Sequence, residues 1–277
     1  MHRRDDHTAA WRLIDTGPLP GPENMAIDEA LLLHFDQQSS APVLRLYGWE
    51  PAALSLGRFQ KASEELDLAE IEQRGLPLVR RITGGGAIYH ADELTYSIVC
   101  SPQQIPPTTS IKDSFRVLTS FLLDFYSRLG LSAGYAMDIV QQEQLLGQRT
   151  AYCFAGKESY DILINGRKIG GNAQRRLKQA IFQHGSVPLR DHLADGLACL
   201  AVKPAGVSDA VTCLEGEGLV CNREELAALL ADSFCSRMGG LLQPDTLTQA
   251  EKQTAADLAD RKYSVCAWNI KGESVCS

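Results

Sequence analysis

Three consecutive glycines are the first feature whose residue types suit ligand binding. Gly84, Gly85 and Gly86 follow Arg80 and Arg81 in the segment Arg-Arg-Ile-Thr-Gly-Gly-Gly. Without a Cβ, these residues let a ligand or another strand approach the backbone closely, and they leave N–H groups free to donate. The arginines could meet a carboxylate or a phosphate. The alternative is a glycine-rich hairpin turn with exposed arginines, because the spacing matches neither a Walker A loop nor G-x-G-x-x-G.

A basic stretch is the second candidate. Residues that carry or can carry positive charge are Arg167, Lys168, Arg175, Arg176, Lys178, His184 and Arg190. Together they could receive an anionic ligand or an acidic protein. The alternative is a solvated hairpin edge, on which Lys and Arg prevent aggregation. His184 taken alone is typical of a satisfied strand or core histidine.

Cys153 is the candidate nucleophile. A lone cysteine is more often buried and inert, but a thiolate attacks, and a neighbouring lysine lowers a thiol pKa. If Cys153 folds beside Lys168, the two form a nucleophilic dyad. The sequence alone does not establish that proximity.

Capping signals predict the helices that must hold these residues. We expect helices over residues 24–35, in a short segment after Ser63, from Ser110 to Gly130, from Asn222 to Gly239, and from Thr248 onward. Ser110 with Asp113, Asn222 with Glu225, and Thr248 with Glu251 have the spacing of a cap and its third helical residue. Residues 15–23 and 101–109 are rich in Pro or Gly and are predicted to be linkers or loops.

Short apolar segments predict the strands. They are Val43–Trp49, 52–56, 76–82, 94–100, 160–164, Arg167–Ile169 and 180–187. Asn165-Gly166 suits a type I′ hairpin turn, and we expect 180–187 beside that hairpin. Hairpin-paired strands mixed with separate helices predict an α+β fold with mixed, largely antiparallel sheets flanked by helices.

Composition excludes several classes of protein. The 277 residues are 44% hydrophobic and 22% charged, which is typical of a globular chain. No apolar run approaches the roughly 20 residues of a membrane helix, and the first residues lack the apolar stretch of a secretory signal. The net charge of −7 argues against a nucleic-acid partner. The eight cysteines show no C-x-x-C or zinc-ligand spacing, so we expect a reduced, cytoplasmic protein without a metal.

Three motifs in order resemble the lipoate–biotin protein ligase superfamily. They are Arg81-x-Thr83-Gly84-Gly85-Gly86-Ala87-x-Tyr89-His90, Gly166-Arg167-Lys168-x-x-Gly171-x-Ala173-Gln174, and Gln183-His184-Gly185-Ser186. The resemblance runs over residues 24–189 and more loosely to Trp268 and Asn269. It implies a catalytic domain like that of class II aminoacyl-tRNA synthetases and biotin synthetases over residues 24–245. It also implies a C-terminal helical extension, 246–277, packed on the same domain.

Cys153 and Phe154 resemble the cysteine-dependent octanoyltransferase branch of this superfamily. The branch implies transfer of octanoyl from acyl carrier protein, through a Cys153 thioester with Lys168 beside it, to the lysine of a lipoyl domain. Such acceptors include glycine cleavage H protein and 2-oxoacid dehydrogenase E2. The residues implied to bind the acyl group are Arg81, Thr83, Gly84, Gly85, Gly86, His90, Gly171, Ala173 and His184. No cofactor is implied, because a thioester is already activated.

Three other functions remain open at this stage. One is an ATP-dependent lipoate–protein ligase, which needs ATP and Mg. Another is an amidotransferase that moves lipoyl or octanoyl between lipoyl domains through the same cysteine. The third is a non-catalytic module that binds acyl groups or lipoyl domains. The sequence does not specify the acceptor, the donor, the chain-length preference or the oligomeric state.

Overall fold

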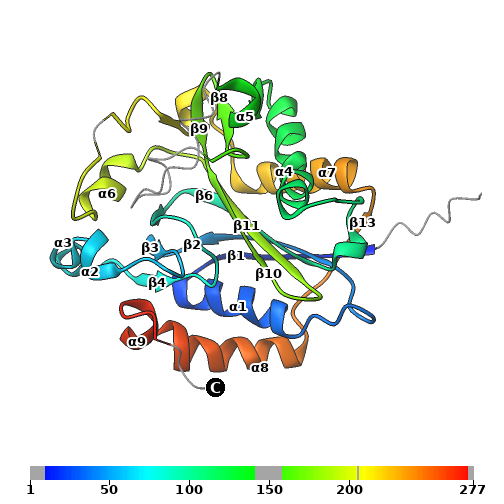
Figure 1. The fold of residues 1–277 in the computed structure, drawn as a ribbon, viewed down its shortest axis with the longest axis horizontal. Helices are drawn as coiled ribbons and strands as arrows, with labels where there is room; N and C mark the ends of the chain where they lie inside the picture. The colour runs from blue at the N-terminus through cyan, green and yellow to red at the C-terminus, as the bar shows by residue number, and fades with distance from the viewer. Residues whose placement is uncertain (1–9, 141–157, 205, 274–277) are drawn as a thin grey trace, which may run out of the picture.

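The computed structural model describes residues 10–140, 158–204 and 206–273, and a six-stranded mixed sheet lies at its centre (Figure 1). In spatial order the strands are β10 (Gly171–Arg176), β11 (Ile181–Pro188), β6 (Glu93–Cys100), β2 (Val43–Trp49), β1 (Ala10–Leu19) and β13 (Leu241–Pro244). Pairing is antiparallel from β10 to β2 and parallel from β2 through β1 to β13. The α+β expectation is confirmed.

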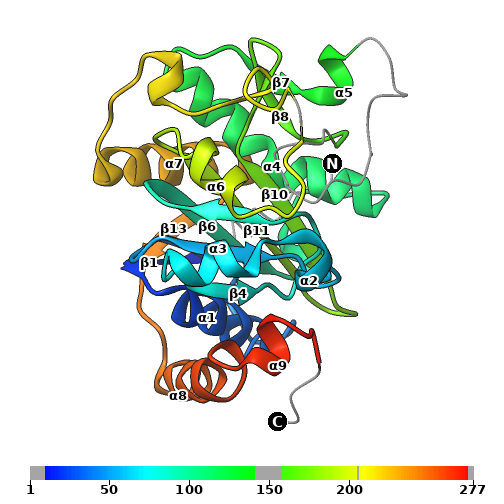
Figure 2. The same cartoon turned by 90° about the vertical axis from the view of Figure 1, so that its left-hand side faces the viewer.

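Helices cover both faces of this sheet. On one face lies α1 (Gly21–Leu33), with α8 (Gln249–Leu258) beyond it, and on the other lie α4 (Ile111–Arg128) and α7 (Arg223–Met238) (Figures 1 and 2). Strand β6 has apolar residues for both helix layers, because successive side chains of a strand point to opposite faces of the sheet. Leu94, Tyr96 and Ile98 enter the core under α4 and α7, whereas Val99 packs in the core beside α1.

The predicted caps are confirmed at three helices. Ser110, Asn222 and Thr248 each accept a hydrogen bond from the backbone N–H three residues later, and they open α4, α7 and α8. Side-chain oxygens at this position satisfy N–H groups that the helix leaves without partners.

The linker predicted over residues 15–23 is wrong, because it belongs to β1 and the first turn of α1. Pro20 precedes α1, so the helix begins before Asn24. Asn24 lies buried inside the helix and donates to the carbonyl oxygens of Leu19 and Gly48 instead of capping it. The central sheet therefore begins ahead of residue 24, where the motifs placed the domain boundary.

Two smaller sheets flank the large one. One has the order β12 (Val211–Thr212), β9 (Arg167–Ile169), β8 (Ile162–Ile164), β7 (Ala133–Tyr135), and the other β4 (Leu78–Arg80), β3 (Ala53–Leu56), β5 (Ile88–His90). Six of the ten pairings within the described residues are antiparallel. Asn165 and Gly166 have φ of 51° and 78°, as the type I′ hairpin turn between β8 and β9 requires.

The expectation that residues 180–187 lie beside this hairpin is wrong. Strand β11 pairs with β10 and β6 in the large sheet. The chain changes sheets at Gly170, between β9 and β10, where φ is +73° and a Cβ would lie 2.0 Å from the Ser186 carbonyl oxygen. Only glycine fits this crossing, and the crossing joins the strand of Lys168 to the large sheet.

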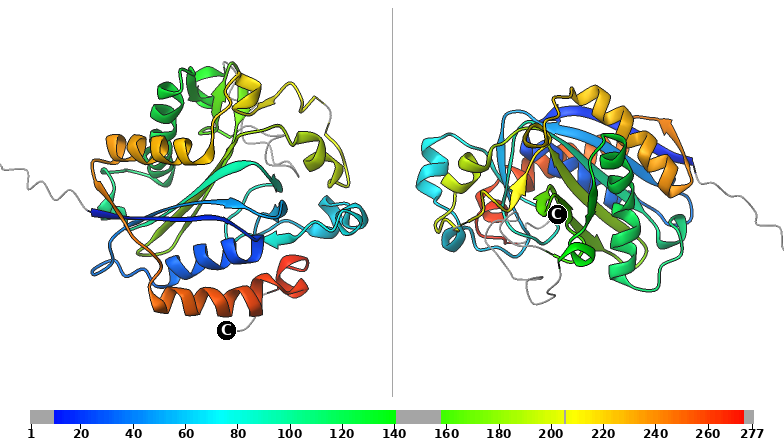
Figure 3. Two further views of the ribbon diagram at one scale, coloured as in Figure 1. Left: turned by 180° about the vertical axis from the view of Figure 1, so that it is seen from behind. Right: turned by 90° about the horizontal axis from the view of Figure 1, so that it is seen from above.

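Short helices complete the chain. They are α2 (Ala62–Glu65), α3 (Leu68–Gln73), α5 (Ala136–Ile139), α6 (Leu193–Ala198) and α9 (Cys266–Asn269). Figure 3 shows α8 and α9 on the same side of the large sheet as α1. Among the described residues, no helix combines the length and apolar character needed to cross a membrane.

Candidate active site

A narrow cavity, here called the glycine-loop cavity, lies between the large sheet and the triple-glycine segment. Six residues predicted from the motifs line it: Arg81, Gly85, His90, Gly171, Ala173 and His184. The remaining wall comes from Tyr47, Trp49, Ile88, Thr95, Asn172, Gly185 and Ser186. The cavity is thus formed by the glycine loop together with β2, β5, β6, β10 and β11. Residues of all three motifs line it.

Arg81 holds the glycine loop in shape from inside the protein. Its guanidinium donates to Ser55, at 3.0 Å to the carbonyl oxygen and 2.5 Å to Oγ, and to the carbonyl oxygens of Gly84 and Gly86 at 3.3 and 2.9 Å. Arg81 is buried, so the alternative of an exposed arginine turn is wrong. Gly84 and Gly86 contribute through these carbonyl contacts, while Gly85 adopts the φ of +98° that favours glycine.

His90 links that arginine to a buried carboxylate. His90 Nε2 lies 2.6 Å from Ser55 Oγ, and Nδ1 lies 2.9 Å from Glu93 Oε1. The His90 ring stacks on Trp49, with centroids 3.8 Å apart. These contacts leave the imidazole a single orientation in the cavity wall.

Glu93 ties the wall together and was not predicted from the sequence. Its carboxylate accepts hydrogen bonds from Thr95 and from Ser186, the latter at 3.0 Å. Burial raises the pKa of Glu93, but the His90 ring and the hydrogen bonds from His90, Thr95 and Ser186 outweigh it, so the net shift is downward. The signal available in the sequence was an acidic residue three positions after His90, at the head of an apolar strand.

His184 is held neutral on the opposite wall. Its Nε2 lies 2.7 Å from Thr83 Oγ1, and its Nδ1 lies 3.8 Å from Asp28 Oδ2. Burial lowers the pKa of His184 well below 6.5, and the positive charge of Arg81 and the His90 ring lower it further. The imidazole is therefore neutral at this buried position, because burying a charge is costly.

An ion pair on α1 and β2 supports this wall. Arg45 donates to Asp28 at 2.8 Å, and Asp28 also accepts from Tyr47 and Ser97 at 2.9 and 2.7 Å. All four side chains are buried. The sequence signal for Asp28 was an acidic residue within the apolar segment of α1, and it was missed.

Lys168 lies on β9 and is 2% exposed. Its Nζ lies 2.7 Å from Asp161 Oδ2, and that oxygen also accepts the backbone N–H of Glu158 at 2.7 Å. Lys168 is therefore not a solvated edge lysine. Asp161, missed in the sequence, precedes the apolar strand β8. Cys153, the predicted partner of Lys168, lies outside the described residues, so the dyad stays a prediction.

The basic stretch is not one exposed patch. Lys168 and His184 are buried, and Arg167 donates to Glu217 at 2.7 Å. Alternation along the strands explains this, because neighbouring residues point to opposite faces.

The C-terminal segment anchors the residue that precedes Arg81. The Arg80 backbone N–H donates to Asn269 Oδ1 at 3.0 Å, its guanidinium donates to the Trp268 and Ile270 carbonyl oxygens at 2.9 Å each, and Trp268 Nε1 donates to the Arg80 carbonyl oxygen at 2.8 Å. Residues far apart in sequence thus fix the start of the glycine loop. Within the part of the chain that is described, no three His, Cys, Asp or Glu side chains are grouped as metal ligands.

Comparison with known proteins agrees with this arrangement. Residues 20–235 match the model of the family described as lipoyl protein ligase A/B catalytic domain. Octanoyltransferase LipM of Geobacillus kaustophilus is 36% identical over 272 residues, which cover 94% of this chain and 98% of that protein.

Solved structures of similar proteins share the fold. Lipoate–protein ligase A bound with ATP superposes with a TM-score of 0.79 at 28% identity, over 94% of this chain and 98% of that one. A bipartite lipoate protein ligase from Thermoplasma acidophilum, studied with its E2 lipoyl domain, gives 0.79 at 26% identity, over 96% and 98% of the two chains.

Proposed function

Because this chain belongs to the lipoyl protein ligase A/B catalytic domain family, we propose that it is an octanoyltransferase of protein lipoylation that works through Cys153. The observation that carries the proposal is the glycine-loop cavity, in which six motif residues converge on one site. Near-full-length similarity to octanoyltransferases LipM supports octanoyl as the transferred group, and the ligase studied with a lipoyl domain supports a lipoyl-domain acceptor.

The first chemical step is thioester exchange. The Cys153 thiolate attacks the octanoyl carbonyl carbon, and the bond from that carbon to the donor sulfur breaks. The donor leaves as a thiolate and becomes a thiol by taking up the proton that Cys153 released. Both thioesters are alkyl thioesters, so little free energy is lost. The donor we propose is octanoyl–acyl carrier protein.

The second step makes an amide. The neutral Nζ of the acceptor lysine attacks the Cys153 thioester, the carbon–sulfur bond breaks, and the proton lost by nitrogen returns to the cysteine thiolate. Forming an amide from a thioester is downhill, so the proposal includes no ATP, metal or other cofactor. In the amidotransferase alternative the donor is an octanoyl-lysine amide of another lipoyl domain: the Cys153 thiolate attacks its carbonyl carbon, the carbon–nitrogen bond breaks, and the donor lysine nitrogen takes up the proton. That first step is uphill, and only the second step is shared with the octanoyltransferase.

Lys168 supplies positive charge for both steps. Its ammonium group can lower the pKa of a neighbouring thiol and stabilise the oxyanion that develops on the acyl carbonyl. Asp161 fixes the position of that ammonium group, because buried charges need a partner. Lys168 is three residues before Gly171, which lines the glycine-loop cavity, and Gly170 makes the crossing between the two sheets.

The walls of the glycine-loop cavity suit an acyl chain. Tyr47, Trp49, Ile88 and Ala173 present carbon surface to the cavity. The polar groups in the wall are satisfied by one another, as in the set formed by Ser55, His90 and Glu93. An uncharged chain therefore enters without stripping water from an unpaired polar group. A cytoplasmic location completes the proposal, supported by six free cysteines within the described residues.

A transfer assay tests the function. The protein is incubated with an unmodified lipoyl domain and one of three donors, and the acceptor is weighed. The donors are octanoyl–acyl carrier protein alone, free lipoate with ATP and magnesium, and a second lipoyl domain that carries octanoyl. We expect a gain of about 126 Da, the mass of octanoyl less a proton, with the carrier alone. Modification only with lipoate and ATP would instead identify a ligase. Modification only with an octanoylated lipoyl domain as donor would identify an amidotransferase.

A further inference from the structure

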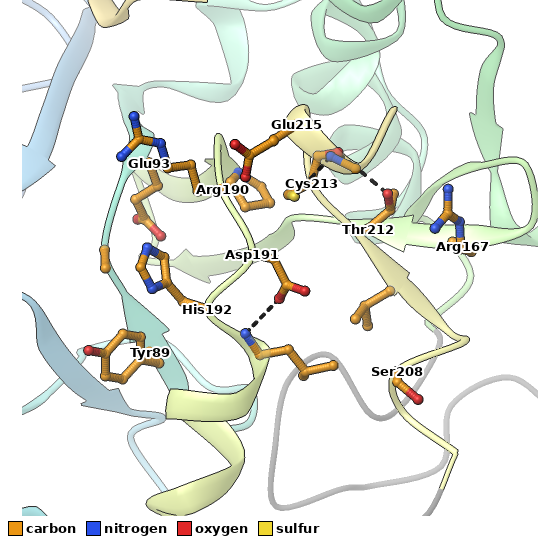
Figure 4. Close-up of a pocket in the computed structure, with 15 residues that line it drawn as sticks. Tyr89, Glu93, Arg167, Arg190, Asp191, His192, Ser208, Thr212, Cys213 and Glu215 are labelled. Atoms are coloured by element: carbon orange, nitrogen blue, oxygen red, sulfur yellow. Dashed lines mark hydrogen bonds between the residues drawn. The ribbon is translucent and has the colours of Figure 1, made fainter. Parts of the chain in front are cut away.

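A second cavity of about 280 Å³, here called the outer pocket, has no role in the mechanism above. Tyr89, Glu93 and His192 lie along one side of it, and Arg167, Thr212 and Ser208 lie along the other (Figure 4). It is formed by the ends of β5, β6 and β11 together with β12. Its volume is near the lower end of the roughly 300–1,000 Å³ typical of small-molecule sites.

Glu93 forms part of the wall between the two cavities. Its side chain lines the outer pocket and accepts hydrogen bonds from Thr95 and Ser186, both of which line the glycine-loop cavity. Its other partner, His90, lines the glycine-loop cavity, while the preceding residue, Tyr89, lines the outer pocket. The two cavities are therefore adjacent, separated by one layer of side chains.

The far wall leads to Lys168. Strand β12 pairs with β9, so that Val211 lies opposite Lys168 and Thr212 lies opposite Ile169. Val211, Thr212 and Arg167 all line the outer pocket. The outer pocket therefore borders the strand that carries Lys168 as well as the wall of the glycine-loop cavity.

Apolar, hydroxyl-bearing, positively charged and acidic side chains line the outer pocket. Pro188, Leu193 and Val211 are apolar, Ser208 and Thr212 carry hydroxyl groups, and Arg167 and Arg190 carry positive charge. The carboxylates of Glu93 and Asp191 already accept hydrogen bonds, the latter from the Leu193 backbone N–H at 2.8 Å.

Arg190 is suited to bind an anion at the edge of the outer pocket. Its side chain is 62% exposed, and Asp92 Oδ1 lies 3.9 Å from its Nη1, which is too far for a hydrogen bond. An arginine in this state can turn toward an incoming phosphate, which it recognises through paired N–H groups.

We propose that the outer pocket binds the phosphopantetheine arm of the thioester donor, an inference that rests on the proposed function. The arm is a rod with a dimethyl carbon, two amides and a phosphate at the end away from the sulfur. The apolar residues suit the dimethyl carbon, the hydroxyl groups and Glu215 suit the amides, and Arg190 suits the phosphate. Free phosphopantetheine, coenzyme A and a carrier protein all present this chemistry.

Two octanoyl thioesters test the proposal. Octanoyl-phosphopantetheine has the whole arm, whereas octanoyl-N-acetylcysteamine has the same thioester and only one amide. Acylation of Cys153 is followed by intact mass and by thiol release. We expect kcat/KM to be at least about tenfold higher for the whole arm, as a charge-assisted hydrogen bond provides.

Variants of the outer pocket test whether it causes the preference for the thioester with the whole arm. Val211→Trp, which fills the outer pocket, should lower kcat/KM at least about tenfold more for the phosphopantetheine thioester than for the N-acetylcysteamine thioester. Val202→Trp is the matched control, because Val202 is 75% exposed and is not among the residues that line the outer pocket. Arg190→Gln should make phosphopantetheine and pantetheine thioesters equivalent. Comparing coenzyme A with carrier protein then shows which source of the arm is preferred.

Three results would overturn this assignment and leave the proposed function standing. The first is equal acylation of wild-type Cys153 by the two thioesters, and the second is an equal loss for both in Val211→Trp. The third is protection of Cys153 from acylation by AMP but not by phosphopantetheine, which would assign the outer pocket to a nucleotide. If neither thioester acylates Cys153, the proposed function itself fails.

Discussion

Lys168 Nζ lies 2.7 Å from Asp161 Oδ2, and both side chains are buried. Lys168 comes from β9 and Asp161 from the residue before β8, so the type I′ hairpin turn brings them together. A buried ion pair of this kind is a weak contributor to stability, because desolvation offsets much of the attraction. Its geometry is instead suited to holding one ammonium group in a fixed place.

A Lys168 substitution should separate stability from chemistry. Lys168→Met leaves the Asp161 carboxylate buried without its partner, so we expect about 3–5 kcal/mol less unfolding free energy, measured with urea. The double variant Lys168→Met with Asp161→Leu should recover most of that stability but not octanoyl transfer. Wild-type transfer by the folded double variant would show that the lysine has no catalytic role.

Gly57 and Gly84 should respond differently to the same substitution. A Cβ on Gly57 would lie 1.9 Å from the Gly85 carbonyl oxygen, whereas a Cβ on Gly84 has open space around it. Gly57→Ala must displace the glycine loop, and we expect a loss of about 1–3 kcal/mol together with lower transfer. Gly84→Ala is the control and should change stability by less than about 0.5 kcal/mol. Equal effects on thermal unfolding would show that the loop is not held by this contact.

His184 should make stability depend on pH in a defined range. The pKa of His184 is about 6.5 in the unfolded chain and lies well below 6.5 in the folded protein. Between the folded and unfolded pKa, the unfolded chain binds a proton that the folded protein does not. Unfolding free energy should therefore fall as pH drops below about 6.5, by up to about 1.4 kcal/mol per pH unit. Above pH 7 the effect vanishes.

The matching measurement is urea unfolding from pH 5 to 7.5. His184→Gln should flatten the dependence in this range, whereas His34→Gln, at an exposed histidine, should not. Glu93 contributes only at lower pH, because its folded pKa lies below 4.5. An unchanged slope in His184→Gln would contradict a neutral His184.

The C-terminal anchor should be sensitive to one hydrogen bond. Trp268→Phe removes the indole donor of the buried Arg80 carbonyl oxygen while keeping a ring in place. We expect a loss of about 1–3 kcal/mol, because the carbonyl is left unsatisfied, and reduced transfer because Arg81 follows directly. Cys266→Ala, at an exposed residue of the same helix, is the control. Full activity in Trp268→Phe would mean that the glycine loop holds its shape without the anchor.

Local signals predicted much of the fold. Ser110, Asn222 and Thr248 cap helices as expected, because capping depends on residues only three apart. Asn165 and Gly166 form the predicted hairpin turn, because a turn likewise depends on residues that are adjacent in the sequence. The partner of β11 and the role of β1 could not be predicted, because strand pairing depends on contacts distant in sequence.

The sequence motifs predicted which residues belong to the site, but they did not predict the contacts among those residues. Arg81, His90 and His184 line one cavity as the resemblance implied, yet nothing in the spacing showed that Arg81 faces inward toward its own loop. Glu93, Asp161 and Asp28 were missed, because each acts through partners on another helix or strand. The available signals were an acidic residue at the head of an apolar strand and, for Asp28, one within an apolar helix.

The most direct test of the account is the mass of the protein after incubation with octanoyl–acyl carrier protein alone. We predict a single adduct of about 126 Da on Cys153, absent from Cys153→Ser and present in Cys213→Ser, a buried cysteine of the outer pocket. Addition of a lipoyl domain should return the mass of the wild-type protein to its starting value as the acceptor gains the group. Transfer by Cys153→Ser at the wild-type rate would contradict the account.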